Sequence, residues 1–265
     1  MNKKKKDEHR NLLLTSYTAA EIRKQLEDDA EDPMLWYKLG NAVSDEEGAE
    51  AGIEIYSQGL LYNPFDAWLH FGRGRKNIGL LRFERCIADV NLAIRFHPEV
   101  WNFWYYRAVA NNLAGNSQAA VDDFMHCFKL STPEEQYPLV DWMFLSYLDM
   151  GDKQKAKEVL ELIDHNVMPP TMDYAYRRRV MLYKGVITPE EFIDLEHIKA
   201  NTLDKPGRVD LEVQTLTFGL FAYYDYIGDT EKANEVLLRI TTFPPSAAFG
   251  CLKGNAIARK RGLIA

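Results

Sequence analysis

Apolar side chains recur along this chain at helical spacing, and the whole pattern repeats after 34 residues. One stretch begins at His70 and ends at Pro98, and a second begins at Trp104 and ends near Pro133. The same offset separates Pro64 from Pro98. Because residues three and four positions apart share one face of an α-helix, each stretch predicts a pair of amphipathic helices. One pair cannot cover its own apolar face, so successive pairs are expected to stack into a continuous core.

Glycine followed by a capping residue marks the turns between the predicted helices. Gly115-Asn116, Gly151-Asp152 and Gly228-Asp229 each end one helix and begin the next. Thr18 and Glu21 have the spacing of a capping box, which predicts a short leading helix over 18–29.

A final helix is predicted over 246–261. We expect Phe249, Leu252 and Ala256 to lie on its buried side. Repeat arrays need such a terminal helix, because the last pair would otherwise expose its apolar face.

The 34-residue unit resembles the tetratricopeptide repeat. That family has core residues at positions 4, 7, 8 and 11 of a first helix and at 20, 24 and 27 of a second. The corresponding residues of the third unit here are Trp104, Arg107, Ala108, Asn111, Ala120, Phe124 and Cys127. The resemblance implies an all-α fold, a right-handed superhelical solenoid of antiparallel helix pairs. About six repeats and terminal capping helices are expected.

The resemblance divides the chain into three parts. Residues 1–32 are expected to form a charged tail and the leading helix, 33–243 the solenoid, and 244–265 the C-terminal capping helix. The repeats are expected near 33–66, 67–100, 101–134, 137–168, 171–205 and 210–243. The fifth is irregular, since its second helix is out of register and a loop near Pro206-Gly207 lengthens it.

Positions 7 and 23 of the repeat change together. Where position 7 is arginine in the second and third repeats, position 23 is aspartate, whereas the first repeat has Leu39 and Ile55. Because a single buried charge is costly, this joint change predicts an ion pair inside the helix pair. The expected pairs are Arg73–Asp89, Arg107–Asp123 and, in the fifth repeat, Arg177–Asp194.

In the family that the chain resembles, positions 2, 5, 9 and 12 of each first helix line a concave face that binds peptides or protein segments. The binding residues implied here are Tyr37, Asn41, Trp68, Phe71, Arg75, Asn102, Tyr105, Asn112, Asp141 and Arg179. Aromatic side chains interleaved with Asn and Arg are typical of interaction hot spots. The centre of the surface is expected at Trp68, Phe71, Arg75, Tyr105 and Asn112.

Composition and charge narrow the range of partners. The net charge of −7 argues against a general binder of nucleic acids or membrane surfaces, which would normally be basic. No apolar run approaches the roughly 18–20 residues that span a bilayer. The basic start of the chain is followed by too short an apolar run for a signal peptide, so a cytoplasmic protein is expected.

Residues that could carry chemistry are better explained by packing. Cys86 and Cys127 stand at small core positions, and the three cysteines lack the spacing of a disulfide framework or metal site. The histidines show no metal-ligand spacing, and His70 stands at the aromatic position of its repeat. The sequence therefore predicts no cofactor, no metal site and no enzyme.

The first functional hypothesis is an adaptor whose concave groove holds a segment of another protein or a peptide. The alternative is a regulatory protein that responds to a ligand or peptide and thereby alters a partner. A remote alternative is an enzyme of unrecognised type. Neither nucleic acid nor a membrane is an expected partner.

Overall fold

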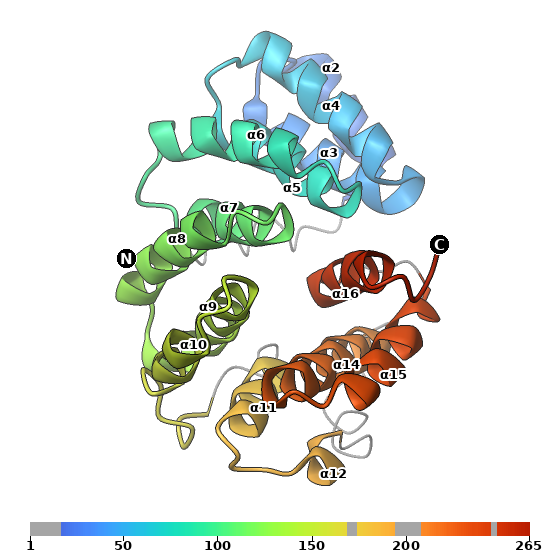
Figure 1. Cartoon of the computed structure of the whole chain (residues 1–265). Helices are drawn as coiled ribbons and strands as arrows, with labels where there is room; N and C mark the ends of the chain where they lie inside the picture. The colour runs from blue at the N-terminus through green and yellow to red at the C-terminus, as the bar shows by residue number, and fades with distance from the viewer. Residues whose placement is uncertain (1–16, 169–173, 194–207, 245–247) are drawn as a thin grey trace. The chain divides into compact units, whose positions relative to one another are not determined.

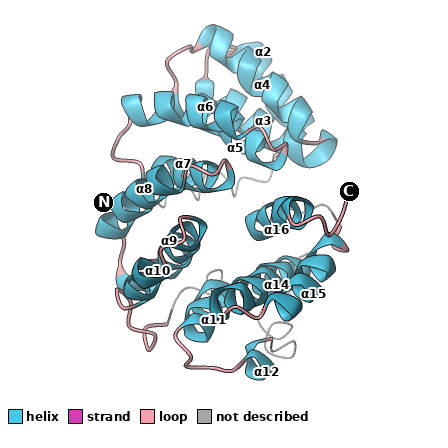
Figure 2. Ribbon diagram, viewed as in Figure 1, coloured by secondary structure: helices cyan, strands magenta, loops and turns pink. Residues whose placement is uncertain are grey.

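The computed structural model describes residues 17–168, 174–193, 208–244 and 248–265, and every regular element in these ranges is helical (Figure 2). The fourteen α-helices found there confirm the all-α prediction. They divide into two compact units, Met1–Ala114 and Gly115–Ala265, called here the first and second units. The boundary between the two units falls at the glycine turn of the third repeat.

The first unit contains α2 (Ala19–Asp28), α3 (Pro33–Glu47), α4 (Ala49–Tyr62), α5 (Ala67–Gly79), α6 (Phe83–Phe96) and α7 (Trp101–Leu113). Each helix packs on the next, and in addition α3 contacts α5 and α5 contacts α7 (Figure 1). The first helices of successive pairs therefore lie side by side. Thr18 and Glu21 form the predicted capping box at the start of α2.

The second unit contains α8 (Ser117–Leu130), the short 3-10 helix η1 (Pro133–Glu135), α9 (Tyr137–Asp149), α10 (Lys153–Leu160), α11 (Tyr174–Tyr183), α12 (Pro189–Phe192), α14 (Arg208–Ile227), α15 (Thr230–Thr241) and α16 (Phe249–Lys260). Within it α9 packs on α10, α14 packs on α15, and α11 contacts both α9 and α14. The described helix that follows α11, α12, has only four residues. The first helix of the irregular fifth repeat therefore packs mainly against neighbouring first helices.

One hydrogen bond recurs with the period of the sequence. In three successive first helices, a ring nitrogen at position 4 bonds to the carbonyl oxygen six residues earlier. The bonds join Trp36 Nε1 to Ala30 O (2.8 Å), His70 Nε2 to Pro64 O (2.9 Å) and Trp104 Nε1 to Pro98 O (2.8 Å). Because each carbonyl lies just before its helix, the bond fixes the direction from which the chain enters the helix.

Glycines bring the helices of the first repeat close together. A Cβ atom on Gly40 of α3 would lie 2.5 Å from Cε1 of Tyr56, and one on Gly72 of α5 would approach the same atom equally closely. The Tyr56 ring, fully buried on α4, is thus held between two glycines. A Cβ atom on Gly52 would overlap Ser44. The small residues at positions 8 and 20 of this repeat, Gly40 and Gly52, thus allow its two helices to approach closely.

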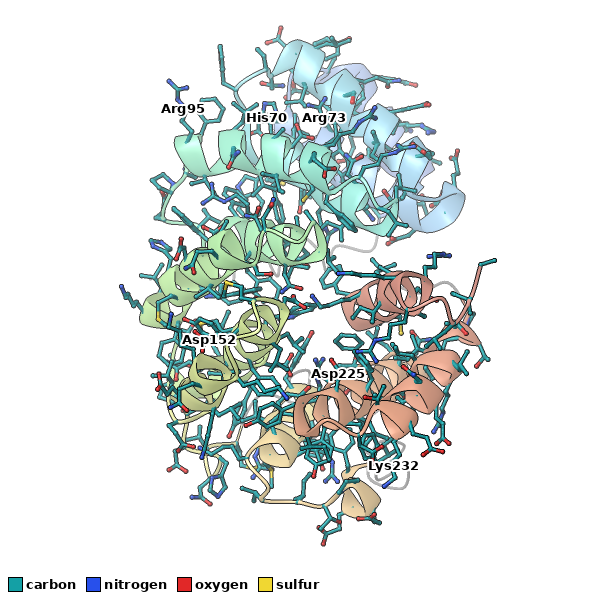
Figure 3. All side chains as sticks on the ribbon, in the orientation of Figure 1. His70, Arg73, Arg95, Asp152, Asp225 and Lys232 are labelled. Atoms are coloured by element: carbon teal, nitrogen blue, oxygen red, sulfur yellow. The ribbon has the colours of Figure 1, made fainter. Side chains whose placement is uncertain are left out.

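The predicted ion pair of the second repeat is confirmed. Arg73 donates from Nε to Asp89 Oδ2 (2.9 Å) and from Nη2 to Asp89 Oδ1 (2.7 Å), which is a bidentate arrangement. Nδ1 of His70 lies 3.4 Å from Asp89 Oδ1. His70 and Arg73 come from α5 (Figure 3), so the carboxylate on α6 joins the two helices of the pair.

The other two expected pairs stay predictions. Arg107 and Asp123 belong to different units. Asp194 lies outside the described residues. Arg177 donates from Nε and Nη2 to the His165 carbonyl oxygen, at 3.1 and 2.9 Å.

The buried side of α16 was predicted wrongly. Ala256 is exposed, and Phe249 and Leu252 are only half-buried. The buried residues are Gly250, Cys251, Lys253, Gly254 and Ala258. A Cβ atom on Gly250 would lie 2.8 Å from Phe218 of α14, so the glycine face of α16 is the one that allows close packing.

Candidate binding surface

Aromatic rings from α3, α5 and α7 form one cluster in the first unit. The Trp68 ring lies 5.0 Å from Phe103 and 5.9 Å from Tyr37 between ring centroids. Phe71 lies 5.0 Å from Phe103 and 5.3 Å from Tyr106. These edge-to-face and tilted contacts are the geometries that aromatic rings prefer. The three first helices are therefore joined by their rings.

The aromatic cluster extends along α7 to its N-terminus. Tyr105 contacts Tyr106 at 5.5 Å and stacks on Trp101 at 4.9 Å, with an interplanar angle of 12°. Trp101 and Tyr105 are four residues apart, a spacing that places side chains on one helix face. Trp68, Trp101, Tyr105 and Tyr106 all keep part of their surface exposed.

The expected exposure of Tyr37 and Phe71 is wrong. Both side chains have no exposed surface, although their positions in the repeat implied the binding face. The reason is that α3, α5 and α7 lie so close that these rings fill the space between them. Phe71 in particular cannot be the centre of a contact surface. Its buried ring packs against the rings of Trp68 and Tyr106.

Arg75 is half-buried beside this cluster. Its Nη2 donates to Asn41 Oδ1 (2.8 Å), and Asn41 Nδ2 in turn donates to the Tyr37 carbonyl oxygen (3.1 Å). The guanidinium lies 5.9 Å from the centroid of the Tyr106 ring. Asn41 and Tyr106 thus position the guanidinium from both neighbouring first helices.

The charge of Arg75 has no carboxylate partner in the described part of the chain. The ion pairs found in the first unit involve other residues, and Arg75 Nε has no hydrogen-bond partner. The adjacent Lys76 lies 3.7 Å from Asp45. Burial, together with the charge of Arg75, lowers the pKa of Lys76 to about 8. At this corner of the first unit, Arg75 is therefore the cation whose charge no carboxylate among the described residues compensates.

Two further expected residues come from α7. Asn102 keeps part of its surface exposed, as Tyr105 does, whereas Asn112 is buried. The expected exposure of Asn112 is therefore wrong. The part of α7 near its N-terminus remains accessible, and the part near its C-terminus is packed.

The last two expected residues, Asp141 and Arg179, form an ion pair inside the second unit. Arg179 Nε lies 2.9 Å from Asp141 Oδ1, and their side chains are 1% and 0% exposed. The expected exposure is wrong here as well. Phe144 stacks on Tyr183 at 4.3 Å and contacts Tyr226 at 5.2 Å, so side chains of α9, α11 and α14 fill the face that these helices share.

Comparisons with known proteins identify the architecture. No family model matches the sequence, and no curated protein matches it. A tetratricopeptide repeat protein from Parabacteroides merdae is similar in structure, with a TM-score of 0.55, 14% identity and 76% of each chain covered. The chain has the tetratricopeptide-repeat fold.

PilF of Pseudomonas aeruginosa is a second similar structure. Its TM-score is 0.52 at 15% identity, and the match covers 71% of this chain and 83% of PilF. At these identities the similarity extends to the fold, so function must be argued from this chain's own residues.

Within the tetratricopeptide-repeat fold, sequence reasoning missed three residues of this surface. Trp101 and Tyr106 stand at positions 1 and 6 of their repeat, outside the positions taken from the family. The spacing of four between Trp101 and Tyr105 was the signal that could have found the first. Lys76 follows Arg75 directly, and nothing in the repeat pattern distinguishes it. The partly exposed residues of this surface are together called the aromatic–arginine surface: Asn41, Trp68, Arg75, Lys76, Trp101, Asn102, Tyr105 and Tyr106.

The described residues give little support for a reactive cysteine, a metal site or a membrane-spanning helix. The three cysteines are buried, and burial raises the pKa of the Cys86 thiol. Among the described residues, no group of three histidine, cysteine or acidic side chains is placed to hold a metal ion. In the same ranges, no helix combines the length and the apolar character needed to span a bilayer.

Proposed function

We propose that this tetratricopeptide-repeat chain is a scaffold that binds a protein or peptide segment through the aromatic–arginine surface of the first unit. The observation that carries the proposal is Arg75, whose charge is oriented by Asn41 and lacks a carboxylate partner among the described residues. A half-buried guanidinium without a counter-ion is a receptor for a carboxylate, because a charge-assisted pair offsets its desolvation.

The rings around Arg75 supply the remaining contact area. The buried Phe71 ring contacts Trp68 and Tyr106, and Tyr106 in turn contacts Tyr105, so these rings are held in place. Such anchors lose little conformational entropy on binding, and Trp, Tyr and Arg are the residues most enriched in interaction hot spots. The ligand that fits best is a segment with apolar side chains for the rings and an acidic group for Arg75.

A library of short random peptides panned on the intact chain tests this proposal. Peptides selected in this way should carry an acidic residue, and Trp68→Ala and Arg75→Ala should each weaken their binding by more than about fivefold, or about 1 kcal/mol. Isothermal titration calorimetry on synthetic peptides measures the effect.

Arg95→Ala is the matched control. Arg95 is an exposed arginine on α6 (Figure 3), outside the aromatic–arginine surface, so its removal should leave the affinity unchanged. The proposal is wrong if selected peptides bind all three variants as tightly as the original chain.

The pH dependence of the same binding gives an independent prediction. Lys76 is charged below its pKa of about 8 and neutral above it, so the attraction for an acidic peptide should decline as the pH rises from about 7 to about 9. We expect a loss of about two- to fivefold, the size of one partly exposed ion pair. Lys76→Met should bind with little pH dependence over this range. An equal decline in that variant would show that Lys76 is not involved.

A further inference from the structure

Among the described residues, two Arg–Asp pairs have a buried aspartate, and their geometries differ. In the first unit, Arg73 holds both carboxylate oxygens of Asp89 by hydrogen bonds, and the pair is partly open to solvent at 28% and 11% exposure. In the second unit, Arg179 and Asp141 are completely enclosed. The first pair has good geometry at moderate desolvation. The second has maximal desolvation.

Hydrogen bonding compensates only in part for the burial of Arg179 and Asp141. The Nε–H of Arg179 donates to the Tyr183 hydroxyl (3.2 Å), although Asp141 Oδ1 is at contact distance. The Tyr183 side chain is placed to hydrogen-bond the Asp141 carboxyl, whereas Nη2 of Arg179 has no hydrogen-bond partner among the described residues. A buried ion pair offsets its desolvation only when its remaining donors and acceptors are satisfied. This pair does not meet that condition.

The surroundings of Arg179 are aromatic. Its guanidinium lies 5.5 Å from the ring centroid of Tyr176 and 5.3 Å from that of Phe218. A Cβ atom on Gly219 of α14 would lie 2.4 Å from Arg179 Cγ, so the stem of the arginine fills the place of a side chain there. Cation–π contacts stabilise the guanidinium independently of Asp141. The arginine therefore has favourable contacts in addition to the one with the carboxylate.

Other charged groups on the neighbouring helices do not relieve Asp141. On its own helix, Asp149 lies two turns further along and pairs with Lys253. The charged or titratable groups on the packed helices include His126 on α8, Lys155 and Glu158 on α10, and the buried Glu212 on α14. Within the described ranges, none of them forms an ion pair or hydrogen bond with Asp141 or Arg179. Arg179 and Tyr183, both on α11, are thus the groups that face the carboxyl.

We propose that Asp141 is a proton switch in the second unit, which packs firmly while the carboxyl is protonated and loosens α11 from α9 when the proton leaves to solvent. The helix that responds is α11. The next described helix in the chain, α12, has only four residues. The position of α11 therefore depends on its contacts with α9 and α14. The ion pair between Asp141 of α9 and Arg179 of α11 is one of these contacts.

At each carboxyl, burial and the contacts with neighbouring groups shift the pKa in opposite directions. The balance between them decides how stability changes with pH. Burial raises the pKa of Asp141 to about 7, and the nearby Arg179 and Tyr183 only partly oppose it. A raised pKa stabilises the folded state at low pH, and this contribution is lost as the pH rises from about 4 to about 7. At Asp89, by contrast, the bonds from His70 and Arg73 outweigh burial and lower the pKa. The first unit should therefore lose stability on acidification, the opposite direction.

Hydrogen–deuterium exchange of the full chain tests the switch. From a carboxyl pKa of 3.8 in the open state and about 7 in the closed state, opening of α11 should be roughly 30-fold more frequent at about pH 8 than at about pH 5.5. This ratio is measured on peptides from residues 174–183, after correction for the intrinsic exchange rate. Asp141→Asn should remove the pH dependence, because the amide resembles the protonated acid and cannot ionise.

Asp89→Asn is the matched control, since it removes the other buried aspartate that pairs with an arginine and should leave the pH response of α11 intact. If Asp141→Asn does not fold, carbon NMR of the unaltered chain still decides, because the Asp141 carboxyl should titrate near pH 7. Titration below about pH 4, or an α11 exchange ratio that Asp141→Asn leaves unchanged, would overturn the proposal.

Discussion

Replacing Asp89 by alanine is expected to lower the free energy of unfolding of the first unit by about 3 kcal/mol. The carboxylate accepts two hydrogen bonds from Arg73 and lies within reach of His70. Removing one partner of a buried pair costs roughly 3–5 kcal/mol, and the 28% exposure of Arg73 places this case at the lower end. Urea unfolding followed by tryptophan fluorescence measures it, since four of the five tryptophans lie in the first unit.

The chain itself supplies the compensating control. The first repeat has Leu39 and Ile55 at the two positions, and both lie in one apolar cluster. The double variant Arg73→Leu with Asp89→Ile should therefore cost only about 1 kcal/mol, chiefly because His70 loses an acceptor. If the double variant is as unstable as the sum of the single ones, the pair does not explain why positions 7 and 23 change together.

Replacing Gly40 by alanine is the second change with a large expected effect, a loss of about 2 kcal/mol. The added methyl group would lie 2.5 Å from the buried Tyr56 ring, and that ring cannot retreat because Gly72 holds its other side. Overpacking of this kind costs about 1–3 kcal/mol, which outweighs the gain of up to about 1 kcal/mol from the higher helix propensity of alanine. The same urea titration measures the difference.

Gly79 provides the matched comparison, because a Cβ atom there meets no atom within 4 Å. Gly79→Ala should leave the stability unchanged or raise it by about 0.5 kcal/mol. Combining Gly40→Ala with Tyr56→Ala should cost clearly less than the two changes added together, since the clash is then absent. Strict additivity would show that the methyl group does not act through the Tyr56 ring.

The helices could be predicted because the residues that determine each helix lie close together in the sequence. The recurrence of apolar and small residues after 34 positions gave the helices, and the capping box at Thr18 gave the start of α2. Arg73 and Asp89 could be paired because two buried charges 16 residues apart in one helix pair must compensate each other. Helix periodicity and charge compensation both act within about one repeat, so one sequence contains them.

The candidate site could be predicted only in part. Trp68, Arg75 and Tyr105 were found from their positions, and they keep exposed surface. Phe71 fits the same positional rule yet is buried, because the rule assumes a spacing between first helices that the packed rings of α5 and α7 do not leave. Position in a repeat determines the direction of a side chain, whereas the distance to the neighbouring helix decides its exposure.

The sequence by itself thus determined the repeat, its helices and the pairing of charges within one helix pair. Only the tertiary structure decided which expected binding residues are accessible, and it enclosed Asp141 and Arg179 as a pair. These two residues are 38 positions apart and come from different repeats, so no local pattern relates them. Their burial arises from the packing of α9, α11 and α14 around Phe144 and Tyr183, which depends on contacts between helices distant in the chain.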